Sequence, residues 1–215
     1  MRMRKKPNLV PRMQRCAELL VTDPQEHCGK WLSDFPGFSK LHLELGCGKG
    51  KFTVGTAQNN PDTLIVAVER VEDAMVIAME RTKAMELNNV RFISGDVRDL
   101  LKYFAPNETD RIYLNFSDPW PSRRHEDRRL TAPGFLALYK SVLPVGGEIH
   151  FKTDNSGLFE FSLKSFERNG FSLSEVKRDL HENGPCGIMT DYEEKFYTQG
   201  LKINRCVAAK TEEEK

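Results

Sequence analysis

Residues 42–52 read HLELGCGKGKF, so an acid, Glu44, and three evenly spaced glycines accompany a short apolar run. The run at 41–45 is expected to be a strand and residues 51–59 a helix, which puts the glycines in the turn between them. Because glycine has no Cβ, such a turn can approach a ligand closely, and the helix that follows offers unpaired N–H groups. Dinucleotide-binding folds hold a pyrophosphate in this way, but with GxGxxG spacing. Here the pattern is ExGxGxG, and the charge of Glu44 opposes a pyrophosphate and favours a cationic ligand.

Apolar runs alternate with amphipathic stretches along the rest of the chain. Strands are expected at 41–45, 63–68, 90–93, 111–116, 148–152, 171–176 and 201–208, with helices at 51–59, 72–87, 133–142 and 156–168. The run TLIVAV at 63–68 is typical of a strand buried on both faces. We therefore predict an α/β protein of Rossmann-like architecture, with a mainly parallel seven-stranded sheet and helices on both faces. In such sheets ligands bind beyond the carboxyl ends of the strands, where the strand order switches.

Three further acids follow the next three expected strands. Glu69 ends the second strand, where a carboxylate can accept hydrogen bonds from both hydroxyls of a ribose. Asp96 follows the third strand, where it can accept from an adenine amino group, and Asp118 follows the fourth. With Glu44 they outline a site for a positively charged, adenosine-containing molecule, although each acid alone also suits a helix N-cap or a solvated loop. The residues expected to bind S-adenosylmethionine are Glu44, Gly46, Gly48, Glu69, Asp96 and Asp118.

Charge is unevenly distributed, although the 215 residues sum to only +1. Residues 1–17 carry six basic side chains and no acid, so the remaining residues sum to −5. A second basic cluster, SRRHEDRRL, lies at 122–130. Such clusters suit a phosphate backbone, and the alternatives are a solvated arm and a loop whose acids and bases pair internally. We predict a basic arm at 1–17, a single domain at 18–209 and a flexible tail at 210–215.

Polar and aromatic residues gather after the fourth and fifth strands and again near the end of the chain. In DPWP, at 118–121, two prolines fix the backbone around Trp120, which either offers a wall on which a planar base can stack or fills a structural turn. Asp154, after the fifth strand, caps the next helix or faces a substrate. The stretch TDYEEKF, at 190–196, precedes the last strand, where its side chains bond a base edge or form a local turn.

Five cysteines without metal-ligand spacing predict reduced, mostly buried thiols in a cytoplasmic protein that holds no metal. No apolar run is long enough to cross a bilayer, and no apolar stretch follows the charged N-terminus as in a signal peptide. We therefore expect no membrane association. The oligomeric state stays open between monomer and homodimer.

Taken together, these stretches resemble the bacterial tRNA (guanine-N7)-methyltransferases, a family of class I S-adenosylmethionine-dependent methyltransferases. The matching stretches are RMRKKP, HLELGCGKGKF, YLNFSDPWPSRRHEDRRLT, IHFKTDN and TDYEEKF. The resemblance implies methyl transfer from S-adenosylmethionine to N7 of a guanosine in the variable loop of tRNA, with Asp118 at the catalytic centre. It implies substrate contacts by Ser122, Asp154, Thr190, Tyr192 and Glu193, and RNA contacts by Arg123, Arg124, His125, Arg128 and Arg129.

The chain departs from the family pattern at three positions. Ser122 stands where the family usually has lysine, Asp127 where a basic residue is usual, and Asn8 where tryptophan is common. The missing lysine removes one contact to the substrate. These changes bear on affinity and substrate range more than on the reaction.

The expected reaction needs no general base, because guanine N7 carries a free lone pair. Catalysis would come from alignment of the reacting atoms and from a carboxylate, Asp118, that stabilises the positive charge developing on the base. The base would first be extruded from folded RNA. Competing functions are methylation of a small molecule or protein, non-catalytic RNA binding, and NAD-linked oxidation. Glu44 and the missing GxGxxG disfavour the last.

Overall fold

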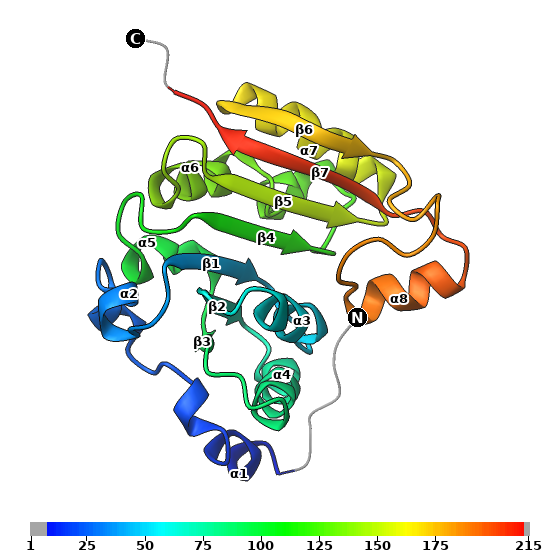
Figure 1. Cartoon of the computed structure of the whole chain (residues 1–215). Coiled ribbons are helices and arrows are strands. Elements are labelled where there is room, and N and C mark those ends of the chain that lie inside the picture. Colours follow the sequence, from blue (N-terminus) through cyan, green and yellow to red (C-terminus); the bar gives the residue numbers. More distant parts are fainter. Residues whose placement is uncertain (1–7, 213–215) are drawn as a thin grey trace.

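The computed structural model describes residues 8–212 and contains a seven-stranded sheet of order β3-β2-β1-β4-β5-β7-β6 (Figure 1). The strands are β1 (Lys40–Leu45), β2 (Thr63–Glu69), β3 (Val90–Ser94), β4 (Arg111–Asn115), β5 (Glu148–Thr153), β6 (Phe171–Lys177) and β7 (Asn204–Lys210). Strands β1 to β5 are parallel, whereas β7 is antiparallel to both β5 and β6. The predicted mainly parallel seven-stranded sheet is confirmed.

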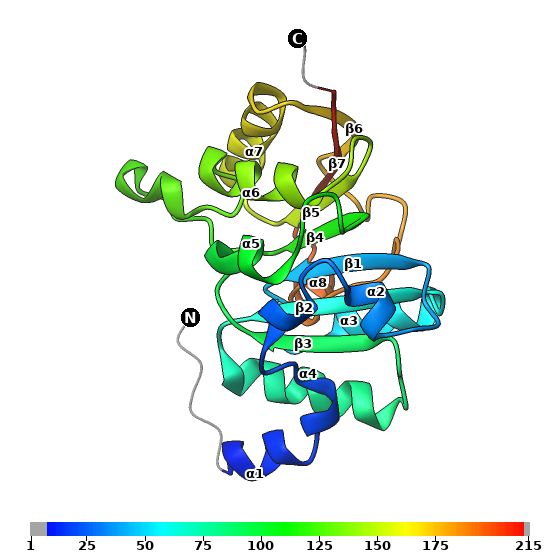
Figure 2. The ribbon, with the colours of Figure 1, turned by 90° about the vertical axis from the view of Figure 1, so that its left-hand side faces the viewer.

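Helices cover both faces of the sheet (Figures 1 and 2). In β2 and β3, neighbouring residues alternate between two separate hydrophobic cores, one on each face. Leu41 and Leu43 of β1 lie in the larger core with α5 (Leu100–Tyr103), α6 (Pro133–Val142) and α7 (Ser156–Arg168). Ile65 and Ala67 of β2 lie in the smaller core, with α3 (Lys51–Asn59) and α4 (Glu72–Ala84). Within residues 8–212, no helix combines the length and the apolar character that a bilayer crossing requires.

Both ends of the predicted domain extend further than expected. Helix α1 (Leu9–Gln14) lies on α4, where Arg12 forms a two-pronged ion pair with Glu80 at 2.7 and 2.6 Å. Cys16 is buried in the smaller core, so residues 8–17 are part of the fold, and residues 1–7 of the predicted arm lie outside the described residues. At the other end, β7 continues to Lys210, and the Thr211 amide donates to the Gly170 carbonyl at 3.0 Å.

Shorter elements fill the connections. They are α2 (Trp31–Asp34) and the 3-10 helices η1 (Ala17–Leu19), η2 (Pro24–His27), η3 (Val97–Asp99) and η4 (Arg123–Arg128). All five cysteines are free thiols. Cys16, Cys47 and Cys206 are buried as expected, whereas Cys28 is half-buried and Cys186 is exposed.

Four α-helices within residues 8–212 were not predicted: the short α1, α2 and α5, and the longer α8. Helix α8 (Asp191–Thr198) occupies the stretch TDYEEKF, for which the expected alternatives were side chains that bond a base edge or a local turn. The Thr190 hydroxyl accepts a hydrogen bond from the Glu193 amide at 3.0 Å, and the Glu193 carboxylate accepts from the Thr190 amide at 3.2 Å. This capping box fixes where the helix starts. Its signature, Thr-x-x-Glu, was present in the sequence.

Candidate active site

The site lies at the carboxyl ends of β1 and β4, which are neighbours at the switch in strand order. Glu44 of β1 is only 2% exposed and accepts hydrogen bonds from the Thr53 hydroxyl at 2.5 Å and from the Asn115 amide at 3.3 Å. Burial raises the pKa of Glu44 to about 7, although both hydrogen bonds and the charge of Lys152 oppose the rise. A cationic partner would stabilise the ionised form of this buried carboxyl group.

The glycine-rich turn is left-handed at all three glycines, with φ of 84° at Gly46, 56° at Gly48 and 75° at Gly50. A Cβ added at Gly50 would lie 2.4 Å from the Cβ of Ala78, so this glycine lets α3 start directly against α4. An added Cβ at Gly46 or Gly48 would meet no atom within 4 Å. The turn is therefore open on the side that a ligand would approach.

Two of the other predicted acids are held in place by backbone amides. The Glu69 carboxylate accepts from the Gly48 amide at 2.9 Å and from the Val71 amide at 2.8 Å. Asp96 caps η3 by accepting from the Arg98 amide at 2.9 Å, as the N-cap alternative supposed. Each carboxylate oxygen has two lone pairs, so both side chains keep acceptor capacity for the hydroxyls or amino group of a ligand.

The loop after β4 carries Asp118 exposed to solvent between two residues with unusual backbones. Phe116 has φ of 54° and Trp120 of 40°, a region that bulky residues rarely adopt. The Ser117 hydroxyl is buried, and no residue of the described part of the chain accepts or donates a hydrogen bond to it. Strained backbone and an unpaired polar atom are typical of functional loops.

Arg129 supports this loop from inside. Its guanidinium donates to the carbonyl oxygens of Pro119 and Trp120, each at 3.0 Å, and lies 4.3 Å from the centre of the Phe161 ring. Arg129 is only 7% exposed. Its donors are engaged within the protein, so the structure gives it a position unsuited to the RNA contact that was predicted.

The rest of the basic cluster lies on η4 and faces solvent. Arg123, Arg124 and Arg128 are exposed, and so is Ser122 just before them. The Arg128 guanidinium lies 5.0 Å from the centre of the Trp120 ring, and the His125 ring lies edge-on to the same indole at 5.8 Å. Trp120 is half-buried and is therefore neither a bare stacking wall nor a core residue.

The predicted substrate-binding residues lie at the ends of β5 and at α8. Asp154 is exposed and does not cap α7, because the cap is Asn155, which accepts from the Leu158 amide at 2.8 Å. Tyr192 is 56% exposed on α8. Its ring centre lies 6.3 Å from that of Phe196, which lies 6.1 Å from that of Phe116. A row of aromatic rings thus connects the loop of Asp118 with α8.

Glu193 is fully buried, unlike its neighbours on α8. Lys152 donates to one carboxylate oxygen at 2.6 Å, and the His181 ring nitrogen Nε2 lies 3.1 Å from the other. With the Thr190 amide these partners occupy the carboxylate, so Glu193 lies out of reach of a substrate. Neither Lys152 nor His181 was predicted from the sequence to contact Glu193. The only signal was a lysine inside the otherwise buried strand IHFKT.

Two more ion pairs connect α8 with α3 and α4, next to the glycine-rich turn. Arg81 of α4 pairs with Asp191 through both nitrogens at 2.7 and 2.9 Å and also donates to the carbonyl of Lys49 at 3.0 Å. Lys51 pairs with Glu194 at 2.6 Å. The first turn of α8 is therefore anchored directly against the glycine-rich turn.

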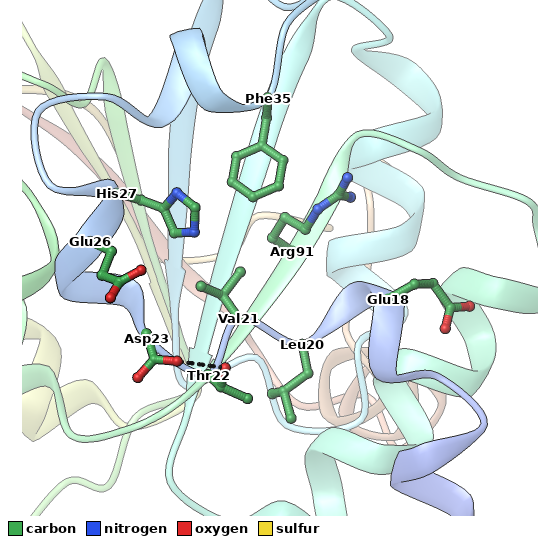
Figure 3. Close-up of a pocket in the computed structure, with 9 residues that line it drawn as sticks. All are labelled: Glu18, Leu20, Val21, Thr22, Asp23, Glu26, His27, Phe35 and Arg91. Carbon is green, nitrogen blue, oxygen red and sulfur yellow. Dashed lines mark hydrogen bonds between the residues drawn. The ribbon is translucent and has the colours of Figure 1, made fainter.

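A hollow of about 300 Å³ lies elsewhere, beside the start of β3 (Figure 3). Phe35, His27 and Arg91 surround it together with the segment before η2. None of the predicted site residues lines it. Among residues 8–212, no group of three or more His, Cys, Asp or Glu side chains is arranged to hold a metal ion.

Known proteins resemble this chain in sequence and in fold. A family profile described as "Putative methyltransferase" matches residues 39–206. The tRNA (guanine-N(7)-)-methyltransferase of Halalkalibacterium halodurans is 46% identical over 209 residues, which cover 97% of this chain and 95% of that protein. The protein of the same name from Bacillus subtilis is 45% identical, with coverage of 95% and 97%. The solved 16S rRNA methyltransferase KamB superposes with a TM-score of 0.65 at 13% identity, over 86% of this chain and 94% of that one, a likeness of fold.

Proposed function

We propose that this chain, which belongs to the family of tRNA (guanine-N7)-methyltransferases, holds its methyl donor and its guanosine along the carboxyl ends of β1 to β5. It is an S-adenosylmethionine-dependent enzyme that methylates guanine N7 in tRNA. The single observation that supports the location best is the buried Glu44 beside an open, left-handed glycine turn.

The residues at this edge fit the donor. S-adenosylmethionine, when bound, supplies a methyl group on a positively charged sulfur. Glu44 favours a positive charge nearby, because its burial disfavours an isolated carboxylate. Glu69 would accept from the ribose hydroxyls and Asp96 from the adenine amino group, since each keeps free lone pairs. Gly46 and Gly48 leave room for the ligand to approach the backbone.

The protein's part in the chemistry is alignment and charge stabilisation. Guanine N7 needs no deprotonation, so no side chain has to act as a base. Asp118 is exposed on a loop whose backbone has positive φ at Phe116 and Trp120. The buried Arg129 holds this loop in place through hydrogen bonds to two of its carbonyl oxygens. From there Asp118 would accept hydrogen bonds from the base and stabilise the positive charge that develops on the imidazole ring of the base.

The surface next to Asp118 suits an RNA backbone. Arg123, Arg124 and Arg128 are exposed on η4, so their charges are available to phosphates. His125 lies beside them against Trp120. Asp154, Thr190 and Tyr192 line the guanosine side, with Ser122 at the start of η4. A cytoplasmic location agrees with this substrate.

The decisive test combines a methylation assay with one variant. Unmodified tRNA is incubated with labelled S-adenosylmethionine, and the label is mapped to base and atom. We expect label at N7 of a variable-loop guanosine, and label elsewhere or nowhere would reject the function. Asp118→Ala should lower kcat by at least about a hundredfold with little change in tRNA affinity. Wild-type turnover in this variant would remove Asp118 from the mechanism.

A further inference from the structure

A buried cluster of three charged or polar side chains joins α8 to the central sheet. Lys152 of β5 is 7% exposed, and its ammonium lies 2.6 Å from the carboxylate of Glu193, which is 0% exposed. The same ammonium donates to the carbonyl of Ile188 at 2.9 Å. One lysine thus holds both the first turn of α8 and the segment that leads into it.

The third member, His181, contacts the cluster through both ring nitrogens. Its Nδ1 accepts a hydrogen bond from the Cys186 amide at 3.1 Å, so the proton resides on Nε2, which donates to Glu193 at 3.1 Å. The His181 ring also packs edge-on against Tyr197 of α8 at 5.1 Å. Both carboxylate oxygens of Glu193 therefore have hydrogen-bond partners, from Lys152, His181 and the Thr190 amide.

Stability alone is a weak explanation for such a pair. Burying two charges costs about as much as their attraction returns, and apolar replacements of buried ion pairs are often neutral or stabilising. The position of Lys152 is more informative. Lys152 lies on the same face of the sheet as Glu44, and it is paired with Asn115 of the neighbouring strand β4. Its ammonium is 4.9 Å from the centre of the Phe52 ring. Burial lowers the pKa of Lys152, and the carboxylates of Glu193 and Glu44 oppose this.

We propose that Lys152, through Glu193 and His181, is a positioning residue that sets α8 over the active site, an inference that rests on the proposed function. Thr190 and Tyr192 lie at the start of α8 and move with it. A displacement of about 1 Å in groups that orient a substrate can lower turnover by about a hundredfold. Lys152 contacts Glu193 and the Ile188 carbonyl, so its effect on the reaction would pass through helix α8.

The test compares two double variants that each remove one ion pair, the first between β5 and α8 and the second between β4 and β5. Lys152→Met/Glu193→Gln removes the buried pair without leaving a lone charge. The control is Arg111→Met/Glu148→Gln, which removes a 2.7 Å pair between the first residues of β4 and β5, at the opposite end of the same strands. The measurements are kcat and KM for tRNA, Kd for S-adenosylmethionine, and hydrogen–deuterium exchange without ligands.

We expect the Lys152/Glu193 variant to lose at least tenfold in kcat/KM for tRNA while its Kd for S-adenosylmethionine stays within about threefold. Exchange should accelerate in residues 188–198 and not in β1 to β4. The control should keep wild-type kcat/KM. A folded Lys152/Glu193 variant with wild-type kcat/KM or unchanged exchange in α8 would overturn the positioning role, as would an equal loss in donor affinity.

Substitutions of His181 keep the proposal testable should the double variant not fold. His181→Gln can retain a donor to Glu193 and should stay within about threefold of wild type, whereas His181→Phe removes it and should show the same selective loss in kcat/KM for tRNA. Equal kcat/KM in the two variants would contradict the proposal. Failure of the function itself is distinct, because a wild-type enzyme without methylation activity would leave the exchange result intact.

Discussion

The backbone amide of Gly48 donates a 2.9 Å hydrogen bond to the Glu69 carboxylate, which ties the turn after β1 to the end of β2. The other carboxylate oxygen accepts from the Val71 amide. Two elements of the donor site are therefore held by one side chain. Its orientation is set before any ligand arrives, which reduces the ordering that binding requires.

Glu69→Gln tests this arrangement. Glutamine has a single acceptor oxygen, so one of the two amides would face an N–H₂ group instead of an acceptor. We expect a loss of about 1–3 kcal/mol in unfolding free energy and at least a tenfold rise in Kd for S-adenosylmethionine. Thermal or urea unfolding and calorimetric titration measure the two effects. Glu72→Gln is the matched control, because Glu72 is exposed and, within residues 8–212, its carboxylate accepts a hydrogen bond only from Ser94. It should leave donor affinity unchanged.

Donor binding should depend on pH through Glu44. Its pKa is about 7 in the folded protein, and a cationic ligand favours the ionised form. Affinity for S-adenosylmethionine should therefore fall by up to about tenfold per pH unit below 7, and binding near neutrality should release a proton. Titrations in buffers of different ionisation enthalpy measure this release. An affinity that is flat between pH 6 and 8 would show that Glu44 does not sense the donor's charge.

The same carboxyl group should make the empty protein less stable as pH rises. Its folded pKa of about 7 lies above the ordinary value of 4.5, so the folded state binds the proton more tightly, and stability is lost between pH 4.5 and 7. Glu44→Gln should remove this loss. At pH 8 we expect it to be as stable as wild type or more so, while donor binding falls at least tenfold. Urea unfolding at pH 5 and 8 gives the comparison.

Two histidines of the sheet, the buried His42 and the half-buried His150, act with the opposite sign. Burial lowers the pKa of His42 and of His150 to about 4, so the folded state resists protonation and stability falls as pH drops from 6.5 towards 4. Each contributes up to about 1.4 kcal/mol per pH unit within that window. His42→Phe keeps an aromatic ring against Tyr113 and should flatten the pH dependence of unfolding free energy between pH 5 and 6.5. An unchanged slope would contradict the assignment to His42.

The exposed arginines at 123–128 and the buried Arg129 should have different functions. Changing the exposed Arg123, Arg124 and Arg128 to glutamine should raise KM for tRNA and reduce the salt dependence of binding, since each phosphate contact contributes to that slope. Arg129→Lys should leave the salt dependence unchanged and lower kcat, because it loosens the carbonyls of Pro119 and Trp120. Equal effects of the two changes on the salt slope would argue against the division.

Local signals account for what the sequence predicted well. Glycine spacing and apolar runs depend on neighbouring residues, and they placed the turn at Gly46–Gly48 and the acids after each strand. The contacts that escaped prediction join distant residues. Lys152 and Glu193 are 41 positions apart, and the lysine within the strand IHFKT does not indicate which residue it pairs with. Likewise Arg128 and Arg129 are adjacent and chemically identical, and only the path of the loop makes one exposed and the other buried.

The order β5-β7-β6 has a consequence for how the protein is made. β6 is synthesised before β7 but pairs only with β7, so it has no neighbour in the sheet until residues 204–210 have left the ribosome. Until then β5 also presents an open edge. In a growing chain, β1 to β5 can pair with one another before β7 is made. The pairs β5–β7 and β6–β7 form only after residues 204–210 have emerged. A chain truncated before residue 204 would therefore expose the edge of β5 and be prone to aggregation.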